Sequence, residues 1–158
     1  MIMFYQLTRS SAEETLAIIL PRALAAGWRV MLRGTDMAAL KRLDARLWHG
    51  PEDGFLPHGL AGGAHDAAQP ILLGTGVIAN AAEGLVLLDN AQTTPAEAAP
   101  LQRVWVLFDG SNAADLAGAR TLWTQLTTAG LAAQYWAEDT GRWEKKSEKP
   151  AVVVAVKD

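Results

Sequence analysis

Short, continuous apolar runs alternate along this sequence with longer segments in which apolar residues recur every three or four positions. The short runs are typical of strands buried on both faces of a sheet, and the longer segments are typical of amphipathic helices. Alternation of the two favours a mostly parallel sheet whose strands are joined by right-handed helical crossovers. We therefore predict an α/β fold of the three-layer, doubly wound class, similar to nucleotide-binding folds.

The ends of the predicted elements are marked by capping and turn residues. Ser11 and Glu14 have the spacing of a capping box, and Gly27 and Gly130 are suited to ending helices. Pro21 removes one internal hydrogen bond from the first helix and predicts a kink there. The predicted helices span residues 12–26 and 113–129, and a helix between them is capped by Thr35 or Asp36 and carries an apolar stripe of Leu40, Leu43 and Leu47. The predicted strands span residues 3–7, 28–33, 70–73, 84–89, 103–108 and 131–136.

The chain has the size and composition of one globular domain, with 158 residues of which 50% are hydrophobic and 20% are charged. We expect this domain to occupy residues 1–137 and a charged extension to occupy residues 138–158. An apolar run within the extension, residues 151–156, either forms an edge strand or stays loosely attached. The stretch between residues 47 and 66 is rich in Gly and predicts a long loop.

Composition narrows the classes of function. Cysteine is absent, which excludes disulfides, thiolate metal sites and cysteine nucleophiles. A net charge of −3 argues against tight unaided binding to DNA, so a link to DNA is expected to be indirect, through a partner. No apolar run approaches the roughly 18 residues of a membrane span, and no basic region precedes the short apolar start. We expect a cytoplasmic protein without membrane contact.

The motifs of nucleotide-dependent and nucleophilic enzymes are missing. The sequence contains neither G-x-x-x-x-G-K-[ST] nor a G-x-G-x-x-G between a strand and a helix, and Gly74-Thr-Gly76 lacks a Lys for phosphates. Asp89 follows an apolar run as a magnesium-binding Asp would, but without a phosphate loop it is better explained as a turn residue. No G-x-S-x-G is present. We predict no catalytic residues and no cofactor.

Three histidines lie in or near the Gly-rich stretch, at positions 49, 58 and 65. Zinc ligands usually pair at tighter spacings such as H-x-x-x-H, which place two donors on one helical turn. We therefore interpret them as loop residues, with His58 hydrogen-bonded, and predict no metal site. An alternative function, a nucleotide-binding or metal-dependent hydrolase of α/β fold, stays open at this point.

Six tryptophans are more than a core of this size normally needs, and Trp and Arg are frequent anchors of protein interfaces. Trp48 and Phe55 lie just beyond the second predicted helix, among Gly and Pro residues that favour exposure. They either dock a partner or fold back as a lid on the core.

A second candidate surface lies on the last predicted helix. Trp123 falls at the margin of the apolar stripe of this helix, and Arg120 lies one turn earlier on the same side. A half-exposed Trp beside an Arg suits an apolar side chain next to a carboxylate, such as the last residue of a peptide. The alternative is a boundary Trp beside an ordinary surface Arg. The stripe itself consists of Leu116, Ala119, Leu122 and Leu126.

Several short motifs succeed one another along the chain. They are Phe4-Tyr5-x-Leu7, Gly27-Trp-Arg-Val, Leu43-Asp-x-x-Leu-Trp48, Phe55-Leu-Pro-His58-x-Leu-Ala-Gly62 and Ala129-Gly130. This combination resembles the chi subunit of the bacterial DNA polymerase III holoenzyme, over roughly residues 3–136. The segment between residues 74 and 102 matches weakly.

The resemblance implies a non-catalytic accessory protein of the clamp loader, with a nucleotide-binding-like sheet but no nucleotide site. Members of this family connect the clamp loader, through the psi subunit, to the acidic C-terminal tail of the single-stranded-DNA-binding protein. Trp48 and Phe55 match family positions that bind psi, a surface that a repair helicase also uses. Arg120 and Trp123 match the Arg and the aromatic residue that bind the tail, although the family member that compares best with this chain carries Tyr at the second position.

Overall fold

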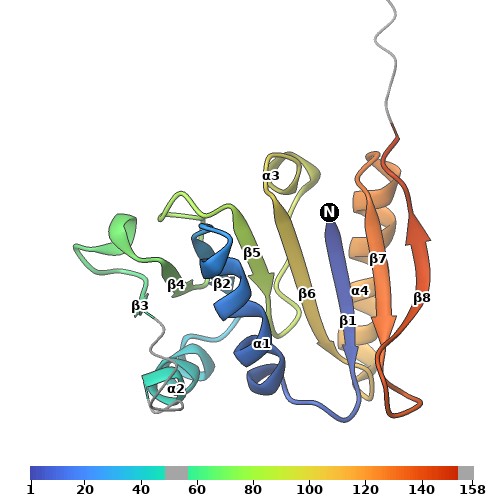
Figure 1. Ribbon diagram of the computed structural model, residues 1–158, viewed down its shortest axis with the longest axis horizontal. Coiled ribbons are helices and arrows are strands. Elements are labelled where there is room, and N and C mark those ends of the chain that lie inside the picture. Colours follow the sequence, from blue (N-terminus) through green and yellow to red (C-terminus); the bar gives the residue numbers. More distant parts are fainter. Residues whose placement is uncertain (49–56, 153–158) are drawn as a thin grey trace, which may run out of the picture.

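Eight strands in the part of the chain that the structure describes, residues 1–48 and 57–152, form one sheet. In this computed structural model the strand order is β3-β4-β2-β5-β6-β1-β7-β8 (Figure 1). All neighbouring strands are parallel except β7 and β8, which are antiparallel. The strands are β1 (Ile2–Leu7), β2 (Val30–Arg33), β3 (His58–Leu60), β4 (Ile71–Gly74), β5 (Gly84–Leu87), β6 (Arg103–Asp109), β7 (Ala133–Ala137) and β8 (Glu144–Lys149).

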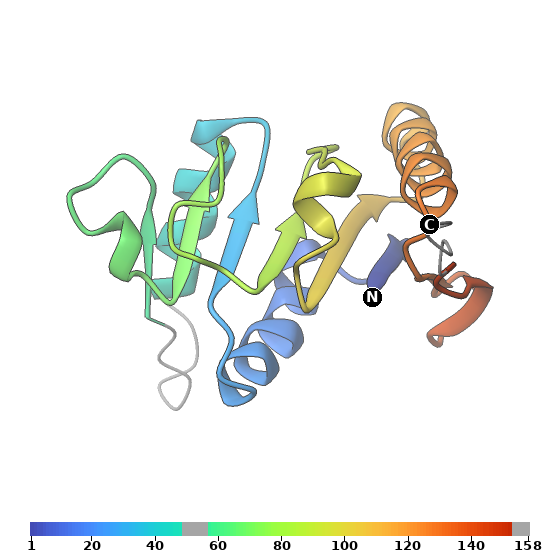
Figure 2. The same cartoon turned by 90° about the horizontal axis from the view of Figure 1, so that it is seen from above.

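Helices cover both faces of the sheet, which makes three layers. Figure 2 shows α1 on one side of the sheet and α3 and α4 on the other. Leu16 of α1 and Leu40 of α2 belong to one buried cluster, whereas Leu122 of α4 and Ala98 of α3 belong to the second. The predicted three-layer, doubly wound α/β fold is thus confirmed. The helices are α1 (Ala12–Ala25), α2 (Met37–Trp48), α3 (Pro95–Ala98) and α4 (Ala113–Thr128), and a short 3₁₀ turn spans Asp66–Ala68.

The capping predictions are also confirmed. The Ser11 hydroxyl accepts a hydrogen bond from the Glu14 amide at 3.1 Å, and the Glu14 carboxylate accepts one from the Ser11 amide at 3.4 Å. Helix α1 continues through Pro21 to Ala25. Gly27 and Gly130 follow α1 and α4 with φ of +84° and +92°, the left-handed region that Gly adopts without steric cost.

Two short elements differ from the sequence prediction. Strand β3 lies inside the stretch predicted as a loop, where its three residues pair with the buried strand β4. Such a strand is too short to show a period, and it depends on a neighbour that is distant in sequence. Helix α3 was not predicted either, although Thr94 caps it by accepting from the Glu97 amide and Pro95 is its first residue.

The edge strand of the C-terminal region is formed by charged residues. Strand β8 pairs with β7 within the predicted extension, but in the segment Glu144–Lys149 rather than in the apolar run 151–156. Of that run, Ala151 and Val152 are exposed and outside any strand, and the other residues are outside the described part. An edge strand keeps its side chains in water, which explains why charged residues are tolerated there.

Candidate functional site

Trp123 lies where α4 meets the sheet. Its side chain is half-buried, and its ring packs edge-on against Phe4 of β1, at 5.3 Å between centroids, and against Tyr135 of β7, at 6.1 Å. Both interplanar angles, 68° and 79°, are those of favourable T-shaped pairs. The predicted stripe lies beneath it: Leu122 and Leu126 are fully buried and Leu116 is partly buried. The prediction that Trp123 lies at the margin of the core is confirmed.

Arg120 is exposed one turn before Trp123. Burial raises the pKa of Tyr135, and the positive charge of Arg120 opposes that rise, which places the guanidinium within electrostatic reach of the ring. Among the described residues, none forms an ion pair with Arg120. We call Arg120, Trp123 and Tyr135 the α4 surface; it combines a fixed aromatic ledge with a cation open to solvent.

The other predicted pair is described only in part. Trp48 is the last residue of α2, and Phe55 falls in the segment 49–56, outside the described residues. Beyond this segment the chain is held by His58, which is 5% exposed and has Nε2 3.2 Å from the Asp44 carbonyl oxygen and 3.3 Å from Asp44 Oδ1. The prediction that His58 is hydrogen-bonded is confirmed, and this contact ties the start of β3 to α2.

The remaining histidines give no metal centre in the described region. His65 is exposed, and His49 falls outside the described residues. Over residues 1–48 and 57–152, no group of three or more His, Asp or Glu side chains is placed to hold a metal ion. In the same ranges, no helix is both long and apolar enough to cross a bilayer.

The loop after β1 holds a buried carboxylate that sequence reasoning missed. The backbone amides of Thr8, Arg9 and Ser10 all donate to Glu138 Oε1, at 3.1, 2.8 and 2.6 Å, and the Ser10 hydroxyl donates to Oε2 at 2.8 Å. In doubly wound folds this first loop is where backbone amides bind phosphate. Here the amides are satisfied by Glu138, a residue about 130 positions away that no local pattern links to them.

Electrostatics support the charged state of Glu138. Burial by itself favours the neutral form, but the hydrogen bonds from Ser10, Arg9 and Thr8 outweigh it and lower the pKa of the carboxyl below its ordinary value. The loop therefore already contains an anion.

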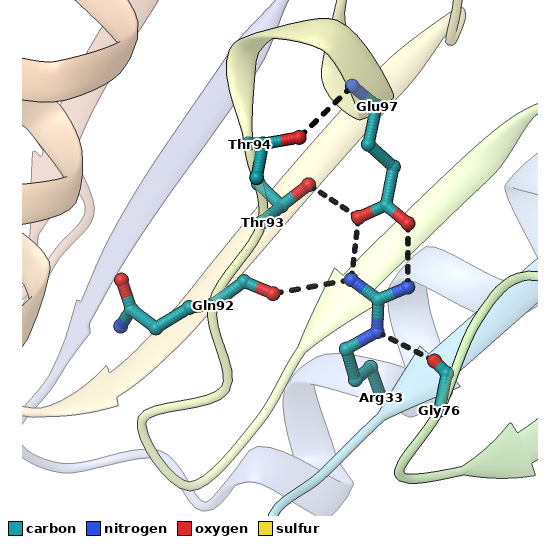
Figure 3. Close-up of polar contacts among 6 residues, drawn as sticks. All are labelled: Arg33, Gly76, Gln92, Thr93, Thr94 and Glu97. Atoms are coloured by element: carbon teal, nitrogen blue, oxygen red, sulfur yellow. Dashed lines mark hydrogen bonds and ion pairs between the residues drawn. The ribbon is translucent and has the colours of Figure 1, made fainter.

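An internal ion pair lies at the C-terminal end of β2 (Figure 3). Arg33 is 8% exposed and binds both carboxylate oxygens of Glu97, at 2.5 and 2.8 Å. Its guanidinium also donates to the carbonyl oxygens of Gly76, at 3.0 Å, and Gln92, at 3.1 Å. Thr93 donates to the same carboxylate at 2.6 Å. Arg33 thus has a structural role, because its donors are taken up inside the protein.

A pocket of about 620 Å³ is lined by α1 and by residues of β1, β6 and β7. Four of the six tryptophans contribute to its wall, namely Trp28, Trp105, Trp136 and Trp143. We call it the tryptophan pocket. Sequence reasoning selected the other two tryptophans and missed these four, because they lie on separate elements and meet only in the folded chain. The high number of tryptophans was the one feature of the sequence that pointed to an aromatic site.

One comparison with known protein families agrees with the motifs. The model of the family described as DNA polymerase III chi subunit, HolC, matches residues 1–134. No curated protein matched the chain significantly. The matched range covers β1 through the start of β7, including α2 and α4. The chain therefore belongs to the DNA polymerase III chi subunit family, a family of replication accessory subunits.

Proposed function

We propose that this protein connects the clamp loader to the single-stranded-DNA-binding protein, by holding the acidic C-terminal tail of the latter on the α4 surface. The observation that carries the proposal is Arg120, which is exposed and without an ion pair among the described residues, one turn from a Trp123 ring fixed by Phe4 and Tyr135. An apolar side chain at the tail end would pack on the aromatic ledge, while a carboxylate binds the guanidinium. The protein would work in the cytoplasm, with no cofactor and no reaction of its own.

A second protein would bind at Trp48 and Phe55. Family resemblance suggests the psi subunit, and the same surface would suit a repair helicase. Support comes from the neighbouring geometry: Leu40 and Leu43 anchor α2 in the core, and the contact between His58 and Asp44 fixes the chain beyond the loop. These contacts fix the residues on either side of the proposed surface, which favours docking because the flanking chain does not have to be ordered on binding.

The alternative of a nucleotide-binding enzyme gains no support from the sheet. The amides that would hold a phosphate donate to Glu138, and the strand-terminal Asp89 lies in a left-handed turn with φ of +52°. A phosphate entering this loop would have to displace a carboxylate of the same charge.

The tail site is tested by titrating a fluorescent peptide with the acidic tail sequence against wild type and Arg120→Ala. We expect the substitution to remove a charge-assisted hydrogen bond worth about 2 kcal/mol, which weakens binding about thirtyfold. Arg42→Ala, which removes an exposed Arg from α2, is the matched control and should bind like wild type. Wild-type affinity should fall as salt is raised. Equal affinities for wild type and Arg120→Ala would refute the assignment.

A further inference from the structure

The tryptophan pocket has aromatic walls that are only partly used by the core. Tyr5 and Trp143 pack edge-on at 5.3 Å, and Trp28 lies 6.3 Å from Trp105. Trp105 is buried, but Trp28, Trp136 and Trp143 are half-buried. Their remaining ring surface is open to solvent. A pocket of about 620 Å³ with apolar walls matches the size and character of small-ligand sites.

Two arginines line the same pocket. The Arg103 guanidinium lies 5.9 Å from the centre of the Trp28 ring, a cation–π distance, and Arg22 projects from α1. Burial raises the pKa of Tyr5 while the charges of Arg103 and Arg22 oppose the rise, so both cations act at the same ring. Among the described residues, neither arginine forms an ion pair. One carboxylate, that of Glu14, is found in the described lining.

Comparison of Arg103 with Arg33 shows what is unusual here. Arg33 is the last residue of β2 and Arg103 is the first residue of β6. Arg33 donates to two carboxylate oxygens and two carbonyls. Arg103 Nε is buried without an acceptor, and its guanidinium makes no hydrogen bond with the described residues. A buried donor without an acceptor is costly, and native proteins retain few of them. Arg103 as a whole is only half-buried and lines the pocket, so the rest of its guanidinium has unused capacity to bind an anionic oxygen next to aromatic rings.

We propose that the tryptophan pocket binds an aromatic or branched apolar group that carries a carboxylate. Arg103 binds the carboxylate, Arg22 adds positive charge at the wall, and Trp136 and Trp143 enclose the apolar group. A free aromatic acid and the C-terminal residue of a peptide supply the same chemistry. The site goes beyond the tail site proposed above and is separate from it, because Tyr5 and Trp143 pack on the opposite face of the sheet from Trp123.

A nucleic acid fits the pocket less well. Stacking on tryptophan would be available to bases, but single-stranded DNA also needs a positively charged path along its backbone. The described lining offers two arginines and one carboxylate, in a chain with a net charge of −3. A single carboxylate on an apolar body needs no such path.

The test uses N-acetyl-L-phenylalanine and its uncharged analogue N-acetyl-L-phenylalaninamide, titrated into the full-length protein and followed by calorimetry and tryptophan fluorescence. We expect the acid to bind and the amide to bind more weakly by about tenfold or by a larger factor. Only the acid can pair with Arg103. Arg103→Gln should weaken the acid about tenfold and leave the amide unchanged. Trp143→Ala should weaken both, since it removes part of the apolar wall.

Two controls keep this test separate from that of the tail site. Arg142→Gln removes an exposed arginine that is next to Trp143 in sequence but not among the described lining residues, and it should bind the acid like wild type. Arg120→Ala should also leave acid binding unchanged, so each site can fail without the other. Far-UV circular dichroism and the Tm of every variant identify any loss of folding.

Two further probes distinguish the sources of the carboxylate and exclude other ligands. If a tetrapeptide ending in phenylalanine with a free carboxylate binds at least as tightly as the acid, the pocket takes a peptide end; if only the acid binds, it takes a free aromatic acid. Both results support the proposal. Equal binding of acid and amide, no binding of either at millimolar concentration, no effect of Arg103→Gln, or displacement of the acid by a short oligothymidine would overturn it.

Discussion

At the scale of single residues, Glu138 shows how one side chain can satisfy the amides of a whole loop. The loop after β1 directs three consecutive amides at one point, as phosphate-binding loops do. The carboxylate of Glu138 supplies the charge that a phosphate would otherwise bring. The sheet thereby gains a connection from the start of α1 to the end of β7, and no nucleotide is needed to satisfy the loop.

Replacing Glu138 by Gln should destabilise the protein by about 2 kcal/mol at neutral pH, because charge-assisted hydrogen bonds become neutral ones. The folded-state pKa is lower than the unfolded one, so this stabilisation is present above the unfolded pKa and is lost as pH falls through the folded pKa. Urea unfolding at several pH values should therefore show wild type and Glu138→Gln converging in acid.

The control for this prediction is Glu83→Gln, which changes an exposed carboxylate whose side chain has no hydrogen bond in the described structure. Its free energy of unfolding should track that of wild type at every pH. If the difference between wild type and Glu138→Gln did not depend on pH, the ionised carboxylate would not be the stabilising species.

The pair of Arg33 and Glu97 is the second residue-scale feature with a measurable consequence. Arg33→Met leaves the Glu97 carboxylate without its main partner. We expect the free energy of unfolding to fall by about 2 kcal/mol. This is less than for a fully buried pair, because the Glu97 side chain is 27% exposed. The double variant Arg33→Met, Glu97→Gln should recover part of this loss in chemical denaturation. A double variant less stable than the sum of the single changes would contradict the pairing.

At the scale of elements, strands β5 and β6 fit together because one position has no side chain. A Cβ on Gly84 would lie 2.7 Å from the ring of Trp105 on the neighbouring strand. The buried Trp105 ring, which also lines the tryptophan pocket, thus occupies space that Gly84 leaves free. Packing of this kind connects the order of the sheet to the shape of the pocket.

Gly84→Ala should therefore lower the free energy of unfolding by about 1–3 kcal/mol, the usual cost of overpacking. It should also change the fluorescence of the buried tryptophan. Gly76→Ala is the matched control, since a Cβ there has no atom within 4 Å. Equal Tm values for the two variants would show that the Trp105 ring moves aside without cost.

Elements with a strong local signal were predictable, and short elements were not. The periodicity of α4 and the capping box of α1 are written into consecutive residues, so their bounds agree with the structure within a residue or two. Strand β3 forms because β4 lies beside it, and β8 forms because β7 has a free edge. Neither partner can be identified from the segment itself. The edge strand was predicted in residues 151–156 because they are apolar. The edge is formed instead by the charged segment Glu144–Lys149, whose side chains can stay in water.

At the scale of the whole molecule, α2, which ends at Trp48, and α4, which carries Arg120 and Trp123, lie on opposite sides of the sheet. Helix α2 packs on one buried cluster and α4 on the other. We therefore expect the acidic tail peptide to bind with the same affinity whether or not psi is present at saturating concentration. Fluorescence anisotropy titrations of the peptide with and without psi check this, and competition between the two would mean that the surfaces overlap or are coupled.

The predictability of the sites also depends on scale. Arg120 and Trp123 are one helical turn apart, so their spacing alone placed them on one side of α4. The tryptophan pocket and the Glu138 loop combine residues from distant parts of the chain. Only the order β6-β1-β7 brings Arg103, Tyr5 and Trp136 together. Because this strand order cannot be read from the sequence, the sequence shows several tryptophans but does not reveal that they line one pocket.

The position of β1 has a consequence for synthesis. Strand β1 pairs with β6 and β7, which are made much later, and the loop after it is closed by Glu138. Residues 2–7 must therefore wait for about a hundred later residues before they find hydrogen-bond partners in the sheet. Contacts of such long range are slow to form. The half of the sheet built from β2, β3, β4 and β5 has its partners closer together in sequence, so we expect it to assemble earlier and β1 to insert late, between β6 and β7.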